Sequence, residues 1–248
     1  MAWQTPKTNW AASDGVRDAD FNRIEGNILE LFKTGAGMTD ITVYVSTSGN
    51  DTSGAGTSAS PYRTITKALS VLPKNLNGKN VIIDIATGTY SESVVIKGYS
   101  NGTLVLSGAY GRTATIDSLE VNSSICEVRT ISLRLSSGGI TVTNGATLLC
   151  TGAVTVADAE HGLYVLNGST CRMYSQLSVS NTTIAGIHAA GASRVYVLNI
   201  SGSDNAAVVI SEEGSVVAYG STNISVNTLA FISRSGGRVL TGSGGLNG

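Results

Sequence analysis

Short apolar stretches recur through the second half of the chain, each bounded by Gly, Asn or Ser: Ile140–Val142, Leu163–Leu166, Ile187–Ala189, Val208–Ile210 and Phe231–Ile232. Five glycines lie at intervals of 23 residues: Gly145, Gly168, Gly191, Gly214 and Gly237. A strand this short cannot bury a face by itself, but stacked coils pair each strand with those above and below it. We therefore predict an all-β fold, a right-handed parallel β-helix of about 23 residues per coil, in which the glycines form a turn ladder at positive φ.

The same spacing aligns other residues without showing which of them face inward. It aligns Cys150, Met173, Tyr196 and Tyr219, and it also aligns Leu148, Cys171, Arg194 and Val217. An inward Arg194 is unfavourable, and the pattern shows one-residue slips within the coils. Less regular apolar segments begin near Val81, and residues 81–248 are predicted to form roughly seven coils.

Two helices are predicted before the coils. Residues 17–33 carry an apolar stripe at helical spacing: Phe21, Ile24, Ile28 and Leu31. This stripe either packs on the same chain or forms an oligomer seam. The second helix spans Pro61–Leu72, with Ser60 as N-cap and Pro73 as its stop, and would cover the open end of the β-helix. We predict a helical segment over 1–38, followed by a strand at Ile41–Val45, a solvated loop and the cap helix within 39–80.

Composition and charge exclude several classes of protein. Charged residues make up only 13% of the chain and the net charge is −1, which argues against a nucleic-acid partner. No apolar run reaches the length of a membrane span, and no apolar leader follows Met1, so we expect synthesis in the cytoplasm without a signal peptide or membrane insertion. The three cysteines lack metal-ligand spacing and are predicted core residues, with no metal or cofactor expected: Cys126, Cys150 and Cys171.

The best catalytic candidates are Asp158 and Asp204, which lie two coils apart. A regular stack would separate their backbones by roughly 9.6 Å, close to the carboxyl separation of inverting glycosidases. Glu160 and His161 lie nearby. The alternative is a turn ladder, because Asn181 and Asn227 alternate with the two aspartates at the same 23-residue spacing. A structural role is expected for His188, and solvated turn charges are expected for Glu212 and Glu213.

Three stretches resemble the start of pectate-lyase-like right-handed β-helix proteins: Val43–Asp51, Gly56-Thr57 and Pro61–Leu69. Residues 86–96 look like the first coil of that family. Residues 5–10 and 20–27 are similar to the N-termini of tail-fibre and tailspike-type proteins of phages and prophages that infect Gram-positive bacteria. This second resemblance implies a virion protein, a homotrimer and an N-terminal segment that docks on phage tail or baseplate proteins. The matching positions are Trp3, Trp10, Phe21, Asn22, Arg23, Glu25 and Asn27.

The fold alone does not decide the activity, since β-helices include both enzymes and binders. The main expectation is a tail protein that recognises a host cell-surface glycan. We expect a binding protein rather than an enzyme. One alternative is a tailspike depolymerase that cleaves a host polysaccharide with a carboxylate pair. The other is a purely structural tail adaptor.

Overall fold

The computed structural model describes residue 20 and residues 41–109 and 111–241. The chain divides into two compact units, Met1–Asp40 and Ile41–Gly248. Apart from residue 20, the helix predicted over 17–33 lies outside the described residues, and so do the seven predicted tail-attachment residues: Trp3, Trp10, Phe21, Asn22, Arg23, Glu25 and Asn27.

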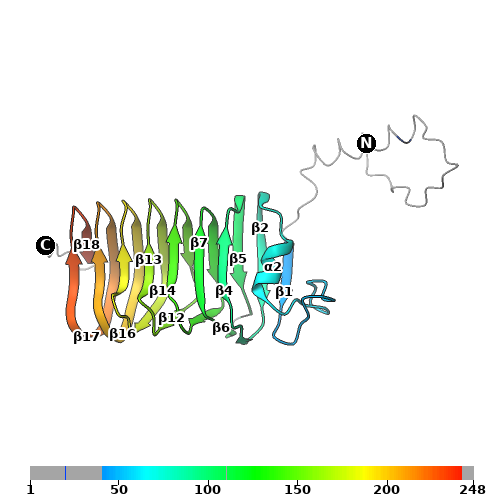
Figure 1. The fold of residues 1–248 in the computed structure, drawn as a ribbon, viewed down its shortest axis with the longest axis horizontal. Helices are drawn as coiled ribbons and strands as arrows, with labels where there is room; N and C mark the ends of the chain where they lie inside the picture. The colour runs from blue at the N-terminus through cyan, green and yellow to red at the C-terminus, as the bar shows by residue number, and fades with distance from the viewer. Residues whose placement is uncertain (1–19, 21–40, 110, 242–248) are drawn as a thin grey trace. The chain divides into compact units, whose positions relative to one another are not determined.

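The second unit is a right-handed parallel β-helix of about seven turns, as predicted (Figure 1). Three parallel sheets run along its length. Sheet 1 contains β1 (Ile41–Val45), β2 (Asn75–Ile85), β5 (Ser100–Ser107), β8 (Ile125–Arg129), β11 (Thr147–Cys150), the first parts of β14 (Thr170–Ser180), β16 (Arg194–Ser211) and β17 (Val216–Ser233), and β18 (Arg238–Thr241).

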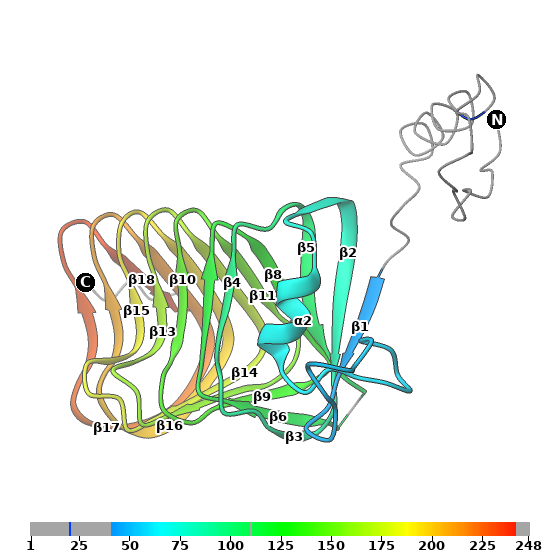
Figure 2. The ribbon, with the colours of Figure 1, turned by 45° about the vertical axis from the view of Figure 1, so that its right-hand side comes forward.

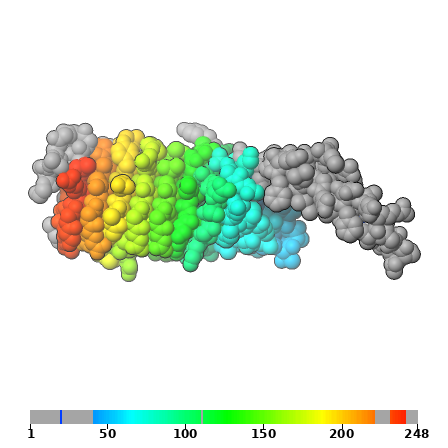
Figure 3. Space-filling view, turned by 90° about the horizontal axis from the view of Figure 1, so that it is seen from above, coloured from blue at the N-terminus to red at the C-terminus, as the bar shows by residue number. Residues whose placement is uncertain are grey.

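The other two sheets complete each turn of the solenoid. Sheet 2 contains β3 (Gly88–Thr89), β6 (Thr113–Ile116), β9 (Ser132–Leu135), β12 (Val154–Ala157), the end of β14 and the middle parts of β16 and β17. Sheet 3 contains β4 (Ser93–Lys97), β7 (Ser118–Asn122), β10 (Ile140–Thr143), β13 (His161–Val165), β15 (Ala185–Ala189) and the ends of β16 and β17. Viewed from above, successive coils form adjacent bands of colour (Figure 3).

The core is a set of apolar columns that run through the stack. One column in sheet 1 consists of Leu104, Cys126, Leu148, Cys171, Val195 and Val217, all of which are buried. All three cysteines are free and buried, which confirms them as core residues. Parallel pairing places like residues one above another, so each coil buries its inward side chains against the next.

The coils differ in length, and this changes the register that a strict 23-residue repeat implies. Thr147 pairs with Thr170, but Thr170 pairs with Arg194, and Arg194 pairs with Val216. The coil between Thr170 and Arg194 therefore has one residue more than the repeat, and the next coil has one fewer. The extra residue places Val195 inward and leaves Arg194 outside.

The same slips move the turn ladder. Gly145, Gly168 and Gly214 occupy the second turn position at φ of 70°, 72° and 74°, and Ala192 (φ 58°) stands in this position in the intervening coil. Gly191 lies one position earlier, and Gly236 takes the place predicted for Gly237.

The N-terminal end of the solenoid is covered by α2 (Ile65–Val71), which buries Ile65, Ala68 and Leu69 (Figure 2). The start predicted at Ser60 and Pro61 is wrong.

Thr64 is the N-cap, and its side chain accepts a hydrogen bond from the Lys67 amide. Tyr62 forms a bridge to Val45 that keeps the chain extended before the helix. In addition, β1 pairs with β2, so the first rung of sheet 1 lies at Ile41–Val45, well before residue 81.

Candidate functional site

The outer surface of sheet 1 carries a cluster of exposed aromatic and cationic side chains on β14 and β16. We call it the Tyr–Arg face, and its members are Arg172, Tyr174, Arg194, Tyr196 and Leu198. Strand alternation explains their position, because Cys171, Met173, Val195 and Val197 fill the inward positions between them. Thr170–Met173 pair continuously with Arg194–Val197, so most of the face stands on a paired sheet, and the register shifts only after Met173.

The two tyrosines form the centre of the face. Tyr174 is 49% exposed and Tyr196 is 37% exposed, and their ring centroids lie 6.2 Å apart. Exposed aromatic rings combine a large apolar surface with a polar hydroxyl, which suits binding of amphipathic ligands. A surface depression of about 290 Å³ adjoins Tyr196 and is lined by Arg172, Arg194, Thr170, Cys171, Val195 and Val216.

The charge of this face is positive. Within the described part of the chain, no carboxylate forms an ion pair with Arg172 or Arg194. The nearest acid on sheet 1 is Glu127, two rungs from Arg172, and Arg129 binds both of its carboxylate oxygens at 2.9 and 2.6 Å. The two arginines therefore keep their charge available for a ligand.

A second cluster, the His cluster, lies on the outer surface of sheet 3 and consists of His161, Tyr164, His188, Glu212 and Arg234. The rings of His161 and His188 lie 4.9 Å apart, and each lies within 5 Å of the Tyr164 ring. Glu212 lies 3.6 Å from Nε2 of His188 and 3.5 Å from the Arg234 guanidinium. The structure thus brings together residues that looked separate in sequence.

Burial lowers the pKa of both imidazoles. For His161 the neighbouring His188 lowers it further, while Glu160 opposes the shift. For His188 the attraction of Glu212 opposes the shift but does not reverse it. The Nδ1 atoms of both rings are buried without a hydrogen-bond partner among the described residues. The pair therefore favours the uncharged state at neutral pH, which is typical of a packed surface cluster.

Asp158 and Asp204 lie in left-handed turns, at φ of 56° and 58°. Asn181 occupies the rung between them at φ 56°, and its side-chain amide donates to Asp158 Oδ1 at 3.0 Å. Asp and Asn tolerate this backbone conformation better than other non-Gly residues. The geometry favours the turn ladder over a catalytic carboxylate pair.

The N-terminal cap contains two carboxylates that sequence reasoning did not single out. Asp51 accepts hydrogen bonds from the Arg63 and Thr64 amides and from the Thr64 hydroxyl. Glu92 accepts from the amides of Ile65 and Thr66 and from the Thr66 hydroxyl. Both carboxylates therefore satisfy backbone groups at the start of α2.

The environment of the cap shifts two pKa values in opposite directions. Burial would raise the pKa of Asp51, but its hydrogen bonds to Thr64 and Arg63 outweigh burial and lower it. Burial, assisted by the charge of Glu92, raises the pKa of Tyr90 to about 12.

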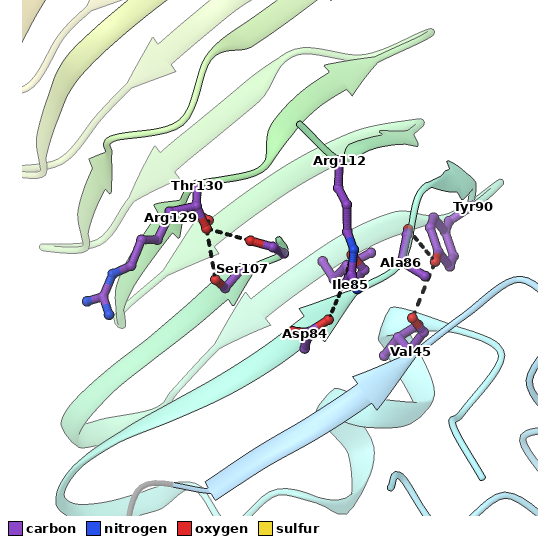
Figure 4. Close-up of polar contacts among 10 residues, drawn as sticks. Val45, Asp84, Ile85, Ala86, Tyr90, Ser107, Arg112, Arg129 and Thr130 are labelled. Atoms are coloured by element: carbon purple, nitrogen blue, oxygen red, sulfur yellow. Dashed lines mark hydrogen bonds and ion pairs between the residues drawn. The ribbon is translucent and has the colours of Figure 1, made fainter. Parts of the chain in front are cut away.

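Further polar contacts join the first coils. The Tyr90 hydroxyl donates to the Ala86 carbonyl at 2.8 Å, and Arg112 pairs with Asp84 across one coil (Figure 4). The Thr130 hydroxyl donates a hydrogen bond to the Gly108 carbonyl at 2.6 Å. The polar groups in this part of the molecule are used for folding.

Comparison with known protein families gives a match, which covers the N-terminal cap and the start of the solenoid. Residues 47–97 match a family described as Protein of unknown function (DUF1565). No curated protein and no solved structure matches the chain. The matched segment runs from the loop after β1 to the end of β4, so it contains Asp51, α2 and Glu92 but no residue of the Tyr–Arg face. Together with the solenoid, the match fits a pectate-lyase-like β-helix family.

No single motif in the sequence marked the Tyr–Arg face. The 23-residue alignment grouped Tyr196 with Met173 and Arg194 with Cys171, both of which are inward residues. The usable signal was local: Val195 and Val197 alternate with Arg194, Tyr196 and Leu198 within one strand. In the part of the chain that the structure describes, no helix is long and apolar enough to cross a membrane, and no metal-ligand cluster occurs.

Proposed function

We propose that this chain is a phage tail-fibre or tailspike-type protein that binds a host cell-surface polysaccharide through the Tyr–Arg face. The observation that carries the proposal is the pair of exposed tyrosines on adjacent rungs, of which Tyr196 lines a surface depression. Aromatic rings on a rigid sheet can stack on sugar rings with little loss of conformational entropy. Polar groups around the rings then orient the sugar hydroxyls.

The virion context rests on the N-terminal resemblance. In this proposal the segment with Trp3 and Trp10 docks on the tail or baseplate, and three chains assemble into a homotrimer. A trimer would present three Tyr–Arg faces, so weak contacts with a repeating polysaccharide would add to a useful avidity. The carboxylate-pair depolymerase gains no support, because Asn181 separates Asp158 from Asp204.

Binding of the full chain to an array of bacterial surface glycans tests the proposal. The double variant Tyr174→Ala/Tyr196→Ala should lose about tenfold or more in affinity. Ile125→Ala is the matched control, because Ile125 is also an exposed apolar residue on sheet 1 but lies outside the face. Equal loss in both variants, or no loss in either, would contradict the assignment of the face.

Two further measurements separate the alternatives. Light scattering should give a mass of three times the 25.4 kDa chain, and a monomer would argue against the trimer. Incubation with a bound polysaccharide should release no oligosaccharide. Release that stops in Asp158→Asn would instead support the depolymerase.

A further inference from the structure

The charge and spacing of the Tyr–Arg face indicate more than a sugar-binding surface. We infer that its ligand is an anionic polysaccharide, which lies along the solenoid axis and places its acidic groups on Arg172, Arg194 and Arg238. This inference rests on the proposed function and adds the chemical class of the ligand.

The first line of argument is the distribution of charge on sheet 1. From β11 to β18 its outward positions carry three arginines and no acid, as the strand registers show. None of the five acids between Cys150 and Thr241 lies on sheet 1: Asp158, Glu160, Glu212 and Glu213 lie outside the strands, and Asp204 lies within β16 at a left-handed position past its sheet 1 part. The carboxylate of Glu213 accepts a hydrogen bond from the Gly191 amide. A neutral glycan would not require this separation of charges, whereas an anionic ligand benefits from it.

The second line of argument is the position of the arginines along the stack. Arg194 and Arg238 occupy the same outward position two rungs apart, with Val216 between them, so their backbones are separated by roughly 9.6 Å. Arg172 lies on the adjacent rung, in register with Tyr196. A polymer that follows the axis therefore meets a cation on three of four successive rungs.

The third line of argument is the arrangement of rings beside these charges. Tyr196 has Arg172 as its neighbour on one side and the small Ala218 on the other. Ala218 leaves space above β17, so a sugar ring can lie against Tyr196 while an acidic substituent reaches Arg194 or Arg172. Guanidinium groups bind carboxylates and phosphates in a bidentate manner, and both acids fit this site.

The test measures binding of the full chain to four polymers by interferometry. Polygalacturonate carries carboxylates on sugar rings, phosphorylated dextran carries phosphates on sugar rings, unmodified dextran is neutral, and linear polyphosphate has charge without sugar. We expect binding to one of the first two polymers. The binding should weaken as salt is raised from about 50 to about 200 mM, because surface charges are screened. Which of the two binds identifies the acid as carboxylate or phosphate.

The variants assign the binding to the face. Arg172→Gln/Arg194→Gln should lower affinity for the acidic polymer by about tenfold or more, because two charge-assisted contacts are lost. Arg134→Gln is the matched control, since Arg134 is exposed on sheet 2 and should leave affinity unchanged. Tyr174→Ala/Tyr196→Ala should also weaken binding of the acidic polymer, because the sugar ring loses its contact with Tyr196.

Each contrary result has a distinct meaning. Equal binding of dextran, unaffected by the arginine variant but lost in the tyrosine variant, overturns the anionic class and leaves the proposed function intact. Binding of polyphosphate as tight as that of the acidic glycan, with no effect of the tyrosine variant, overturns both proposals. Failure to bind either acidic polymer overturns the inference.

Discussion

The N-terminal cap and the Tyr–Arg face use polar side chains in opposite ways. In the cap, Asp51 and Glu92 are bonded to backbone groups at the start of α2. On the face, Arg172 and Arg194 point away from the chain and form no ion pair with the described residues. The family match covers only the first of these regions. The matched segment therefore contains the carboxylates that stabilise the cap, and it contains no residue of the Tyr–Arg face.

The largest expected effect tests the register that creates the face. Val195→Arg places an unpaired charge in the core and should cost several kcal/mol, enough to prevent folding. Arg194→Val should change the free energy of unfolding by less than about 1 kcal/mol, because Arg194 is outside. Urea unfolding of both variants makes the comparison. The reverse ranking would restore the strict 23-residue alignment, in which position 194 is inward.

The next largest change in the free energy of unfolding is expected for a variant in the N-terminal cap. Glu92→Gln keeps the size of the side chain but removes the charge that accepts from three donors of α2, and it should cost about 2 kcal/mol of stability. Glycan affinity should stay the same, because the cap and the face are separate. Glu160→Gln, an exposed turn residue, is the control and should have little effect. A loss of affinity in Glu92→Gln without unfolding would place the ligand at the cap instead.

A smaller free-energy change is expected on the face. Tyr196→Ala should reduce glycan affinity by about tenfold, or about 1.4 kcal/mol, with a change in unfolding free energy below about 1 kcal/mol. Calorimetric titration and urea unfolding of the same sample measure both quantities. A stability loss as large as that of Glu92→Gln would show that Tyr196 serves the fold, and the contrast between the two regions would disappear.

The smallest effect is the pH dependence of the His cluster, which contains the only two histidines of the chain. Burial lowers the pKa of both His161 and His188 in the folded state. The unfolded chain therefore takes up protons first as pH falls below about 6.5, and the free energy of unfolding should decrease there. Above about pH 7.5 both states are almost fully unprotonated at these histidines, so their contribution to stability should be flat.

The charges that face the imidazoles act in both directions. Glu160, Glu212 and Glu213 favour the protonated rings, while Arg234 opposes protonation of His188. Thermal unfolding between about pH 7.5 and about pH 5.5 checks the sign. His161→Phe/His188→Phe should remove the slope in this range. A slope that persists in the double variant would assign it to carboxylates instead.

Much of the fold could be predicted because repetition is visible in a single sequence. The spaced glycines and short apolar stretches predicted a parallel β-helix, and Cys126, Cys150 and Cys171 were correctly placed in its core. The start of the cap helix could not be predicted, because the bridge between Tyr62 and Val45 joins residues far apart in the chain. Ser60-Pro61 has the right residues for a helix start, but this tertiary pairing overrides local preference.

The candidate sites were less predictable than the fold. The pattern of Asp and Asn at residues 158, 181 and 204 indicated turns, and the structure shows left-handed turns there. The His cluster could not be foreseen, because its members come from four successive coils.

The sequence by itself determined that apolar residues recur at coil spacing and therefore that strands stack, since this is a property of the average repeat. The tertiary structure decided which side chains of each coil face outward. A single extra residue between Thr170 and Arg194 reverses inward and outward positions unless the pairing slips to compensate. The slip keeps Val195 and Val197 in the core, because burying them is favourable and burying Arg194 is not. This slip in the pairing leaves Arg194 and Tyr196 on the outer surface, where they form part of the face that we propose for ligand binding.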